Sequence, residues 1–487
     1  MSSLKELLIG IRYAAIGSIE DVDIDRIVTD SCIAKKGDLF VAIRGVNCDG
    51  HDFAKEAVGR GAACLVLEDD MDLGDSRRII VKGTKETLAI LARNFYGNPS
   101  KDIGVIGITG TNGKTTLTYL LDSIFAEAGL RTGVVGTIRY KIDNEEIDAC
   151  NTTPSALVLQ GLLKRMVRHS LDKCVMEVSS HALDQRRTDC IDFDGAILTN
   201  VTSEHLDYHE TFANYLDTKL QLFNNIKSSG YAVLNLDDPN FANAKEAASR
   251  LKVSTFGLSK EADVYAASVE LGINGTVFTL NIRDKSVTVR SNLIGLHNVC
   301  NMLGAASCAA EEGINIEKIK QGLQKVDFIP GRLQRLDMPN NAVLFVDYAH
   351  TDDALKKVLT ALRAIKKKSI ITVFGCGGNR DKTKRPRMGK AAQALSDYVI
   401  ITSDNPRDED PNAIAKDIIG GFSNFADFEV IPDRRKAIEA AITKAQAGDI
   451  VLLAGKGHEK YQVIKERNVP FDDMETVKEL LNERCLV

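Results

Sequence analysis

The sequence lacks the cysteine spacing of a zinc-binding or disulfide-rich chain. Its ten cysteines are scattered from Cys32 to Cys485, and no two of them form a CxxC pair. Structural zinc sites usually take paired ligands at short spacing. Cysteines spread through a long chain in this way are most simply reduced and buried in packing. The sequence therefore predicts neither a zinc site nor a disulfide framework.

Long apolar runs are also missing. No stretch approaches the roughly 20 apolar residues that a membrane-spanning helix needs. The opening stretch MSSLKELLIGIRYAAIG spaces Leu4, Leu7, Leu8 and Ile11 at helical intervals, and it has no long apolar core of the kind found in signal peptides. We expect a cytoplasmic protein with no membrane partner.

Positive charge is not in excess. The chain has 62 Lys and Arg residues against 67 Asp and Glu residues, which gives a formal net charge of −5. A broad nucleic-acid-binding face needs a surplus of basic residues, so this balance argues against a nucleic-acid partner. A local basic pocket for a small anionic substrate is compatible with it.

The sequence does contain alternating strand and helix patterns over its 487 residues. Apolar runs such as IGVIGIT, CVMEVS, AVLNL, VLFVDYA and DIVLLAG alternate with helical patterns. This alternation is typical of α/β folds with mostly parallel sheets and functional loops at the carboxyl ends of strands. The segments YGNPSKD and FIPGRLQRLD have the Gly and Pro residues of breaks in the pattern. We expect three domains, at residues 1–98, 99–330 and 331–487.

The stretch GITGTNGKTT follows an apolar strand pattern and precedes a helical one. Glycines let backbone N–H groups approach phosphate oxygens, Lys114 adds a positive charge, and Thr115 offers a hydroxyl ligand for Mg²⁺. The usual spacing places a glycine where this chain has Ile108, and here the glycine is displaced to Gly110. The alternative is a Gly-rich turn that merely starts a helix. The expected phosphate-binding residues are Gly110, Thr111, Asn112, Gly113, Lys114, Thr115 and Thr116.

Candidate metal ligands follow the next strand patterns. Glu177 ends the run CVMEV, where its carboxylate would face a nucleotide crevice as a hard ligand for Mg²⁺. A capped turn is the structural alternative. The loop TNVTSEHLDYHET carries His205, Asp207 and His209, and their spacing suits a metal cluster and a surface loop about equally.

Together, several stretches resemble the Mur ligase family, in that family's order along nearly the whole chain: GTNGKTT, NTTP, MEVSSHAL, TNVTSEHLDYH, YLDTKLQLF, GLHNVCN, PGRLQRL and DYAHTDDAL. The chain is most similar to members that add 2,6-diaminopimelate to UDP-N-acetylmuramoyl-L-alanyl-D-glutamate in peptidoglycan precursor synthesis. The resemblance implies a small N-terminal α/β domain that binds the UDP substrate. It also implies a central P-loop ATPase-like domain with a parallel sheet, and a C-terminal Rossmann-like domain that binds the amino acid.

The resemblance implies an ATP-dependent amide ligase. In the family, a substrate carboxylate attacks the γ-phosphate of ATP and becomes an acyl phosphate. An amine then converts the acyl phosphate into an amide, and ADP and phosphate are released. Two anions must meet in the first step, which calls for Mg²⁺ and a positive side chain. The catalytic and metal-binding residues that carry over are Lys114, Thr115, Glu177, His205 and Lys219.

Lys219 looks by spacing like an ordinary helical lysine. An ammonium group repels Mg²⁺, so Lys219 could hold the metal only as a carbamate. That modification is implied by the resemblance alone.

The resemblance also assigns three sets of substrate contacts. Nucleotide contacts beyond the phosphate loop are His297, Asn298, Asn301, Arg332 and Asp347. Contacts to the UDP-muramoyl-dipeptide are Thr29, Ser31, Asn47, Asn151, Thr152, Thr153, Ser179, Gln185 and Arg187. Contacts to diaminopimelate are Arg380, Asp404, Asn405, Pro406, Arg407, Gly455 and Glu459.

The stretch SDNPRDEDP follows the strand pattern YVIIT, and in this family DNPR marks enzymes that add meso-diaminopimelate. That amino acid resembles lysine with a second carboxylate on its far carbon. A guanidinium pairs bidentately with a carboxylate, so Arg407 would take this distal group. A helix that starts at Pro411, with acidic residues before it, is compatible with that role.

Two positions depart from the family's pattern. Cys32 stands where arginine is common, which puts in doubt how the uridine nucleotide is held. Asp352 stands where proline is common at a helix start.

The same ligation with L-lysine or another diamino acid is the nearest alternative function, and an ATP-binding regulatory module without catalysis is a more distant one. By resemblance we expect a monomer.

Overall fold

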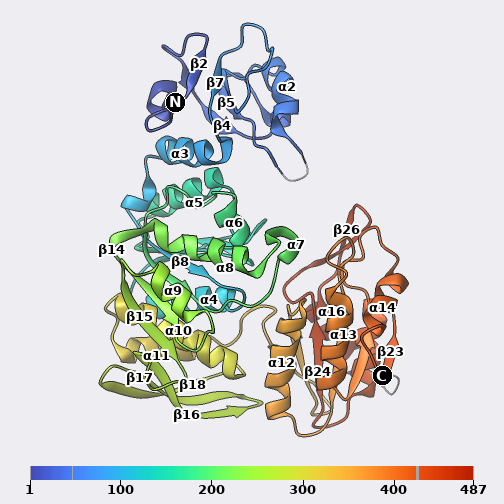
Figure 1. Ribbon diagram of the computed structural model, residues 1–487. Coiled ribbons are helices and arrows are strands. Elements are labelled where there is room, and N and C mark those ends of the chain that lie inside the picture. Colours follow the sequence, from blue (N-terminus) through green and yellow to red (C-terminus); the bar gives the residue numbers. More distant parts are fainter. Residues whose placement is uncertain (1, 46–47, 424–426, 486–487) are drawn as a thin grey trace.

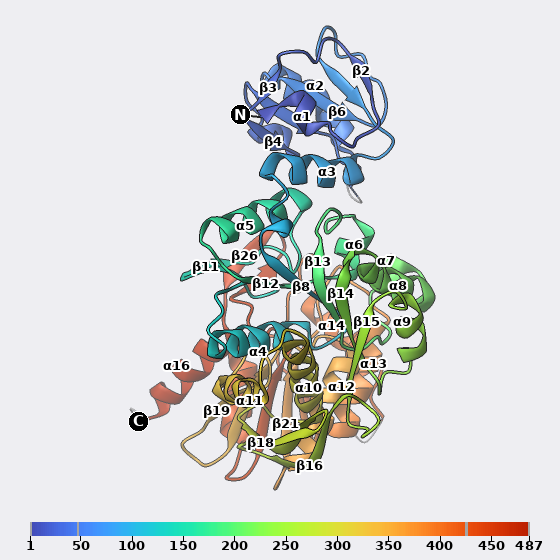
Figure 2. The ribbon, with the colours of Figure 1, turned by 90° about the vertical axis from the view of Figure 1, so that its left-hand side faces the viewer.

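The computed structural model describes residues 2–45, 48–423 and 427–485. They form three α/β domains, each built on its own main sheet (Figure 1). The N-terminal domain lies at one end of the molecule, and the C-terminal domain lies beside the central one (Figures 1 and 2). None of the helices in the described ranges has the length and apolar character needed to cross a membrane.

The N-terminal domain has a five-stranded sheet in the order β2–β7–β6–β5–β4. Its strands are β2 (Ala14–Ile16), β4 (Arg26–Val28), β5 (Asp38–Val41), β6 (Cys64–Leu67) and β7 (Arg78–Ile80). Only β2 pairs antiparallel. The helices are α1 (Leu4–Leu7), α2 (Ala54–Gly59) and α3 (Thr84–Tyr96), and the short strands β1 (Ser2–Ser3) and β3 (Asp23–Ile24) pair with each other. Both β5 and β6 are buried along their whole length, as expected for parallel strands covered on both faces.

The central domain has an eleven-stranded sheet in the order β11–β10–β9–β12–β8–β13–β14–β15–β16–β17–β18. In this spatial order, the strands from β9 through β16 run parallel to one another. At the two ends of the sheet, β10 and β11 and then β17 and β18 pair antiparallel. The strands are β8 (Gly104–Thr109), β9 (Thr132–Val135), β10 (Arg139–Ile142), β11 (Glu145–Asp148), β12 (Lys173–Glu177), β13 (Phe193–Leu198), β14 (Ile226–Asn235), β15 (Lys252–Gly257), β16 (Val264–Gly272), β17 (Gly275–Ile282) and β18 (Lys285–Ser291).

Helices cover both faces of this central sheet. They are α4 (Lys114–Glu127), α5 (Ala156–Arg168), α6 (Ser180–Asp184), α7 (Leu206–His209), α8 (Phe212–Leu220), α9 (Phe241–Ala247), α10 (Leu296–Glu311) and α11 (Ile316–Lys325). One apolar core includes side chains of α4, α10 and α11, and a second includes side chains of α5 and α8. This is the doubly covered parallel sheet that the alternating sequence pattern predicts.

The C-terminal domain has a six-stranded sheet in the order β19–β20–β24–β21–β22–β23, parallel except for β19. The strands are β19 (Gln334–Asp337), β20 (Val343–Asp347), β21 (Ile370–Phe374), β22 (Tyr398–Ile401), β23 (Phe428–Val430) and β24 (Ile450–Ala454), and β25 (Tyr461–Ile464) pairs with β26 (Arg467–Pro470). The helices are α12 (Asp352–Ile365), α13 (Lys384–Leu395), α14 (Pro411–Ile419), α15 (Arg434–Lys444) and α16 (Asp473–Cys485). The predicted helix start at Pro411 is confirmed, and the side chain of Asp410 caps it.

The Pro-Gly break lies at the start of the C-terminal domain. Gly331 has a φ of +66°, and a Cβ there would lie 2.3 Å from the backbone nitrogen of His458. Only glycine permits this close approach. The break therefore packs directly against the loop that follows β24.

The expectation that the cysteines are buried holds only in part. Cys64, Cys174, Cys308 and Cys376 are buried, whereas Cys32, Cys48 and Cys150 are exposed. Cys190 and Cys300 are partly buried, and all nine of these cysteines are free thiols.

Arg434 and Asp473 form a buried ion pair between α15 and α16, with 0% of either side chain exposed and two N–H···O contacts of 2.7 Å. The variant Asp473→Ala leaves a buried guanidinium without its counter-charge, so we expect the free energy of unfolding to fall by about 3–5 kcal/mol. The control is Glu479→Ala, which removes one of the two carboxylates that pair with Arg435 at the surface and should change stability little. Urea denaturation followed by circular dichroism measures both losses, and equal losses would contradict the prediction.

Candidate active site

The phosphate loop joins β8 to α4 through two glycines with positive φ. Gly110 has a φ of +139°, and a Cβ there would lie 1.9 Å from Oγ1 of Thr199. Gly113 has a φ of +91° and directly precedes α4. The loop therefore packs closely against the end of β13, and the start of α4 offers N–H groups of the kind that bind phosphate.

Two lysines meet at one carbonyl oxygen of this loop. Lys114 Nζ donates to the carbonyl oxygens of Gly110 at 2.8 Å and Thr111 at 2.9 Å. Lys219 Nζ, from α8, donates to the same Gly110 oxygen at 3.0 Å. Burial lowers the pKa of both amines, and repulsion by Lys114 lowers that of Lys219 further. Lys219 is therefore biased toward the neutral amine, which is the form that reacts with CO₂ to give a carbamate.

His205 lies close to Lys219 through a shared aromatic neighbour. Lys219 Nζ is 4.5 Å from the ring centroid of Tyr215, and the Tyr215 and His205 rings are 6.3 Å apart. Although 42% of the His205 side chain is exposed, burial of the remainder lowers its pKa to about 4. A neutral imidazole of this kind can coordinate a metal ion.

The other two members of the predicted metal-or-surface loop have different roles. His209 is buried and its Nε2 lies 3.0 Å from the hydroxyl of Ser180, whereas Asp207 is exposed. No group of three or more His, Cys, Asp or Glu side chains in residues 2–45, 48–423 and 427–485 is arranged to hold a metal ion. His205 and His209 both lie beside Tyr215, the ring that contacts Lys219, and of these two only His209 is hydrogen-bonded to Ser180 in the described chain.

Glu177 ends β12 beside the phosphate loop, with 1% of its surface exposed. Its Oε2 accepts hydrogen bonds from Thr115 Oγ1 at 3.0 Å and Thr137 Oγ1 at 2.9 Å, and its Oε1 accepts one from the Thr137 backbone at 2.8 Å. Carboxylate and hydroxyl oxygens are the ligands that Mg²⁺ prefers. The residues present at Thr115 and Glu177 therefore fit a Mg²⁺ ion.

The NTTP segment continues this polar group. Thr152 Oγ1 lies 3.0 Å from Thr137 Oγ1, and Thr153 Oγ1 donates to the Glu177 carbonyl at 2.8 Å. Asn151 is exposed, and its carbonyl accepts a hydrogen bond from Tyr140 at 2.6 Å. The segment is thus anchored next to the candidate metal ligands.

Arg187 lies in the same network without an acidic partner among the described residues. It donates to the Thr153 carbonyl at 2.8 Å and to Gln185 Oε1 at 2.6 Å, and burial lowers its pKa. Ser179 caps α6 by accepting a hydrogen bond from the Ala182 backbone. An unpaired, half-buried guanidinium is a natural partner for a substrate carboxylate.

The predicted contacts in the N-terminal domain stand apart from this network. Ser31 is buried and donates to Glu56 at 2.7 Å, whereas Thr29 and Cys32 are exposed. Asn47 lies outside the described residues. Within the described part of the chain, no hydrogen bond or ion pair links Thr29 or Ser31 to the polar group around Glu177, so their role stays a prediction.

Side chains of α10 border the phosphate loop. A Cβ on Gly113 would lie 2.3 Å from Oδ1 of Asn301, whose amide in turn donates to Asn298 at 3.1 Å. Burial lowers the pKa of His297 to about 4. The three predicted nucleotide contacts of this helix therefore lie on its first turns, beside the loop.

The start of the C-terminal domain also reaches the phosphate loop. Arg332 Nη2 lies 3.4 Å from Thr115 Oγ1 and its guanidinium lies over the ring of Tyr348. Asp347 accepts hydrogen bonds from the backbones of Leu333 at 2.7 Å and Ala349 at 2.8 Å. Arg332 thus contacts the residue that follows Lys114, whereas Asp347 fixes the backbone of the connection.

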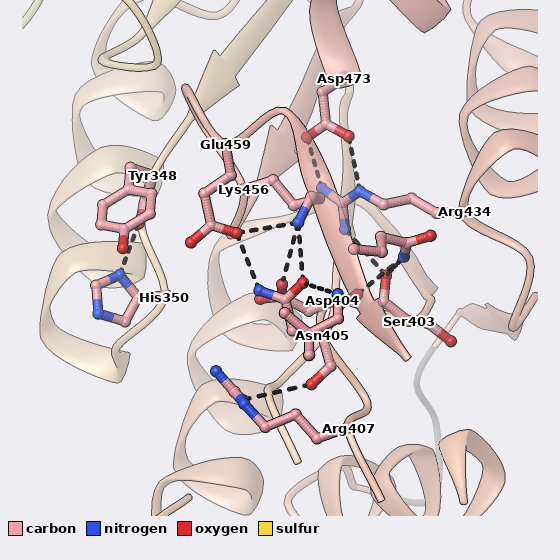
Figure 3. Close-up of polar contacts among 12 residues, drawn as sticks. Tyr348, His350, Ser403, Asp404, Asn405, Arg407, Arg434, Lys456, Glu459 and Asp473 are labelled. Atoms are coloured by element: carbon pink, nitrogen blue, oxygen red, sulfur yellow. Dashed lines mark hydrogen bonds and ion pairs between the residues drawn. The ribbon is translucent and has the colours of Figure 1, made fainter. Parts of the chain in front are cut away.

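The DNPR loop holds Arg407 in an unusual conformation. Its φ is +52°, and its backbone is bonded on both sides to the β25–β26 hairpin, to Val463 at 3.0 Å and from Lys465 at 2.8 Å. Its Nη1 donates to the Gly378 carbonyl at 2.8 Å, and no acidic side chain in the described chain pairs with it. Burial lowers the pKa of Arg407, and the nearby Arg380 lowers it further. The positive pocket of Arg407 and Arg380 therefore has no ion-pair partner among the described residues, and Figure 3 shows Arg407 bonded to the backbone of Asn405.

A negative group lies next to this pocket. Asn405 donates to Glu459 Oε2 at 2.9 Å (Figure 3). Asp404 is 6% exposed, and burial raises its pKa. A Cβ on Gly455, whose φ is +112°, would lie 3.1 Å from Asp404 Oδ2, and Pro406 is buried in the same loop. The predicted diaminopimelate contacts therefore lie after the carboxyl ends of β22 and β24, except for the exposed Arg380, which follows β21.

The phosphate loop and the amino-acid pocket lie in different domains. Asp353 Oδ2, on α12, accepts hydrogen bonds from Asn112 at 3.2 Å and Thr202 at 3.0 Å. In the described ranges, no hydrogen bond or ion pair joins the DNPR loop to Lys114 or Lys219. The structure thus brings the residues of the phosphate loop together and brings the residues of the amino-acid pocket together. It does not bring the phosphate loop and the amino-acid pocket into hydrogen-bond contact within the described chain.

Sequence reasoning missed three residues of these sites. Glu204 is 16% exposed and its neighbours His205, His350, Lys114 and Lys219 lower its pKa although burial opposes this. Thr137 follows β9 and bonds to both oxygens of Glu177. Lys456 is buried beside Glu459. Thr137 and Lys456 could have been identified from the sequence as polar residues that follow parallel strands. Glu204 could have been identified from its position directly before His205 in the SEH sequence.

Comparisons with known families match nearly the whole chain. The model of the Mur ligase middle domain matches residues 108–309. The model described as Mur ligase, glutamate ligase domain, matches residues 331–457, and the model described as Mur ligase family, catalytic domain, matches residues 23–96.

Individual relatives extend over the full length. The UDP-N-acetylmuramoyl-L-alanyl-D-glutamate–2,6-diaminopimelate ligase of Clostridium perfringens is 42% identical over 488 residues, which cover 98% of this chain and 99% of that protein. The ligase of the same name from Bacillus cereus is 43% identical, over 96% of this chain and 95% of that protein. A solved structure of a ligase of this name is 32% identical, with a TM-score of 0.67 and coverage of 97% and 100%. The MurF ligase from Thermotoga maritima in complex with ADP, 20% identical, shares the fold with a TM-score of 0.66 and coverage of 96% and 100%.

The variant Gly110→Ala tests the close packing of the phosphate loop. Its Cβ would overlap Oγ1 of Thr199, so the loop must shift, and we expect the affinity for ATP to fall by at least about tenfold. The control is Gly129→Ala, a glycine that also has a positive φ, +82°, but where a Cβ would have nothing within 4 Å. It should lose some stability and keep its affinity. Calorimetric titration with ATP measures both, and equal affinities of the two variants would count against the packing argument.

Proposed function

This chain belongs to the Mur ligase family, and we propose that it is the ATP-dependent ligase that adds meso-2,6-diaminopimelate to the D-glutamate of UDP-N-acetylmuramoyl-L-alanyl-D-glutamate. The choice of amino acid rests on the side chain of Arg407. Its guanidinium is half-buried, lacks an acidic partner in the described chain and lies beside Arg380. Diaminopimelate has a distal carboxylate that such a group can bind, and lysine has none.

The proposed reaction has two steps. The side-chain carboxylate of D-glutamate attacks the γ-phosphorus of ATP, the bond to the β-phosphate oxygen breaks, and an acyl phosphate and ADP form. The amine of diaminopimelate then attacks the acyl carbon, phosphate leaves with the bonding electrons, and the amine loses a proton to give the amide. Lys114 and Arg332 offset the negative charge of the phosphates, and Arg187 binds a carboxylate of the dipeptide.

Two pairs of side chains would hold two Mg²⁺ ions. Thr115 and Glu177 would hold one, and His205 with carbamoylated Lys219 would hold the second, and these ions would neutralise charge where the two anions meet. The neutral imidazole of His205 and the lowered pKa of Lys219 support this assignment.

The remaining contacts follow the division into domains. The nucleotide end of ATP would lie against His297, Asn298 and Asn301, whose helix borders the phosphate loop. The UDP-muramoyl-dipeptide would extend from Arg187 toward Thr29 and Ser31 of the N-terminal domain. The enzyme would act as a cytoplasmic monomer on small-molecule substrates.

The variant Arg407→Ala tests the choice of amino acid. Loss of the guanidinium leaves the distal carboxylate unpaired, so KM for meso-diaminopimelate should rise by about one to two powers of ten, with KM for ATP and the UDP substrate unchanged. The measurement is phosphate release from the UDP-dipeptide with diaminopimelate stereoisomers, lysine and ornithine. The control is Arg435→Ala, an exposed arginine of the same domain. If the unmodified enzyme uses lysine as fast as diaminopimelate, the choice of amino acid is wrong.

The lowered pKa of Lys219 predicts that CO₂ modifies it. With ¹³C-labelled bicarbonate, the enzyme should show a carbamate resonance by NMR that Lys219→Met lacks, and Lys219→Met should lose nearly all activity. The control Lys227→Met removes a lysine that is paired with Asp194, and it should keep the resonance. A resonance that persists in Lys219→Met would place the carbamate elsewhere.

A further inference from the structure

Lys456 is a fully buried lysine for which the proposed reaction has no role. It follows β24 in the loop between Gly455 and Gly457, and 0% of its side chain is exposed. A buried ammonium is costly unless hydrogen bonds and counter-charges compensate it. Figure 3 shows its amine directed into the space between Asp404, Asn405 and Glu459.

The contacts of Lys456 fix two predicted substrate-binding groups. Its Nζ donates to Glu459 Oε2 at 3.0 Å and to Asn405 Oδ1 at 3.2 Å. Because the Asn405 amide also donates to Glu459 Oε2, that oxygen has two donors. The second oxygen of Glu459 points away from both partners, on the side of Tyr348 and His350 (Figure 3). One oxygen is thus held, and the other is left for a ligand.

The charges of this cluster do not cancel. Lys456 Nζ is 3.9 Å from Asp404 Oδ1 and 3.0 Å from Glu459, so two carboxylates face one ammonium. The nearby Arg434 is neutralised by its bidentate pair with Asp473. Asp404 Oδ1 is buried and has no hydrogen-bond partner. Among the described residues, one negative charge is therefore left over next to the positive pocket of Arg407 and Arg380.

This excess matches the ammonium of an amino acid whose carboxylate binds Arg407. Resting on the proposed function, we propose that Lys456 is a positioning residue of the amino-acid pocket: its ammonium holds the carboxylate of Glu459 and the amide of Asn405 in place and leaves one carboxylate charge for the ammonium of the substrate. Without Lys456, the buried carboxylate of Asp404 and the partly buried carboxylate of Glu459 would face each other without the ammonium between them. They would separate or share a proton, and either change removes the excess charge or misplaces it.

The variant Lys456→Met keeps the length of the side chain and removes its charge. We expect KM for meso-diaminopimelate to rise at least about tenfold, with KM for ATP and the UDP-dipeptide unchanged. The matched control is Lys366→Met, which removes a lysine paired with Asp397 at 2.8 Å in the same domain. It should leave all three KM values unchanged. An unchanged KM for the amino acid in Lys456→Met, or an equal rise for all substrates, would overturn the proposal.

The pH profile provides a readout that a merely structural role would not change. Asp404 is faced by Lys456, Arg434, Glu459, His350, Arg407, Tyr348 and Cys376, and Lys456 is the strongest of the charged groups that lower its pKa. In Lys456→Met, Asp404 should keep its proton to higher pH. The acid limb of kcat/KM for diaminopimelate should then move to higher pH, and an unmoved limb would count against the proposal.

A double variant covers the case in which Lys456→Met does not fold. Asp404→Asn with Lys456→Met removes one buried charge of each sign, so the net charge of the cluster is preserved. KM for diaminopimelate must still rise, because Glu459 and Asn405 lack their anchor, and a normal value would refute the inference. If the unaltered enzyme shows no phosphate release that depends on diaminopimelate, the proposed function fails instead.

Discussion

Lys114 and Lys219 donate hydrogen bonds to the same carbonyl oxygen, that of Gly110. The excess positive charge at the phosphate loop follows from this contact. Two ammonium groups this close repel each other, and burial makes both charges more costly. The carboxylate of Glu204 relieves only part of the cost. Anionic phosphates at the loop, or a carbamate on Lys219, would relieve the rest. The site is therefore least favourable when empty, which is the condition for strong differential binding of an anion.

The C-terminal domain uses the same principle with both signs. Arg407 and Arg380 supply positive charge without an acidic partner among the described residues, while Asp404 and Glu459 exceed the single charge of Lys456. The unpaired positive charge and the excess negative charge each cost stability. Hydrogen bonds hold the Arg407 and Glu459 side chains in place and leave them few other positions. The two centres lie in different domains, and the connection between these domains includes Gly331. Its close contact with the loop of His458 couples that connection to the amino-acid pocket.

The sequence predicted those features that depend on local pattern. The alternating runs predicted parallel sheets, GTNGKTT predicted the loop before α4, and Pro411 predicted the start of α14, because each is decided by neighbouring residues. Contacts between distant segments could not be predicted in this way. Thr137 reaches Glu177 across the sheet, and His209 bonds to Ser180 rather than joining a metal cluster. Such pairings are decided by the three-dimensional packing of strands and helices, which spacing along the chain does not encode.

Arg407 shows how strain and function meet at one residue. A left-handed backbone conformation costs a residue with a side chain about 1–2 kcal/mol, and glycine would remove that cost. Glycine, however, has no guanidinium. The hairpin β25–β26 stabilises this conformation through hydrogen bonds to the backbone N–H and carbonyl of Arg407. These bonds offset the cost of the left-handed conformation and do not involve the guanidinium. The guanidinium then remains free of any acidic partner in the described chain, and a substrate carboxylate can supply the missing charge.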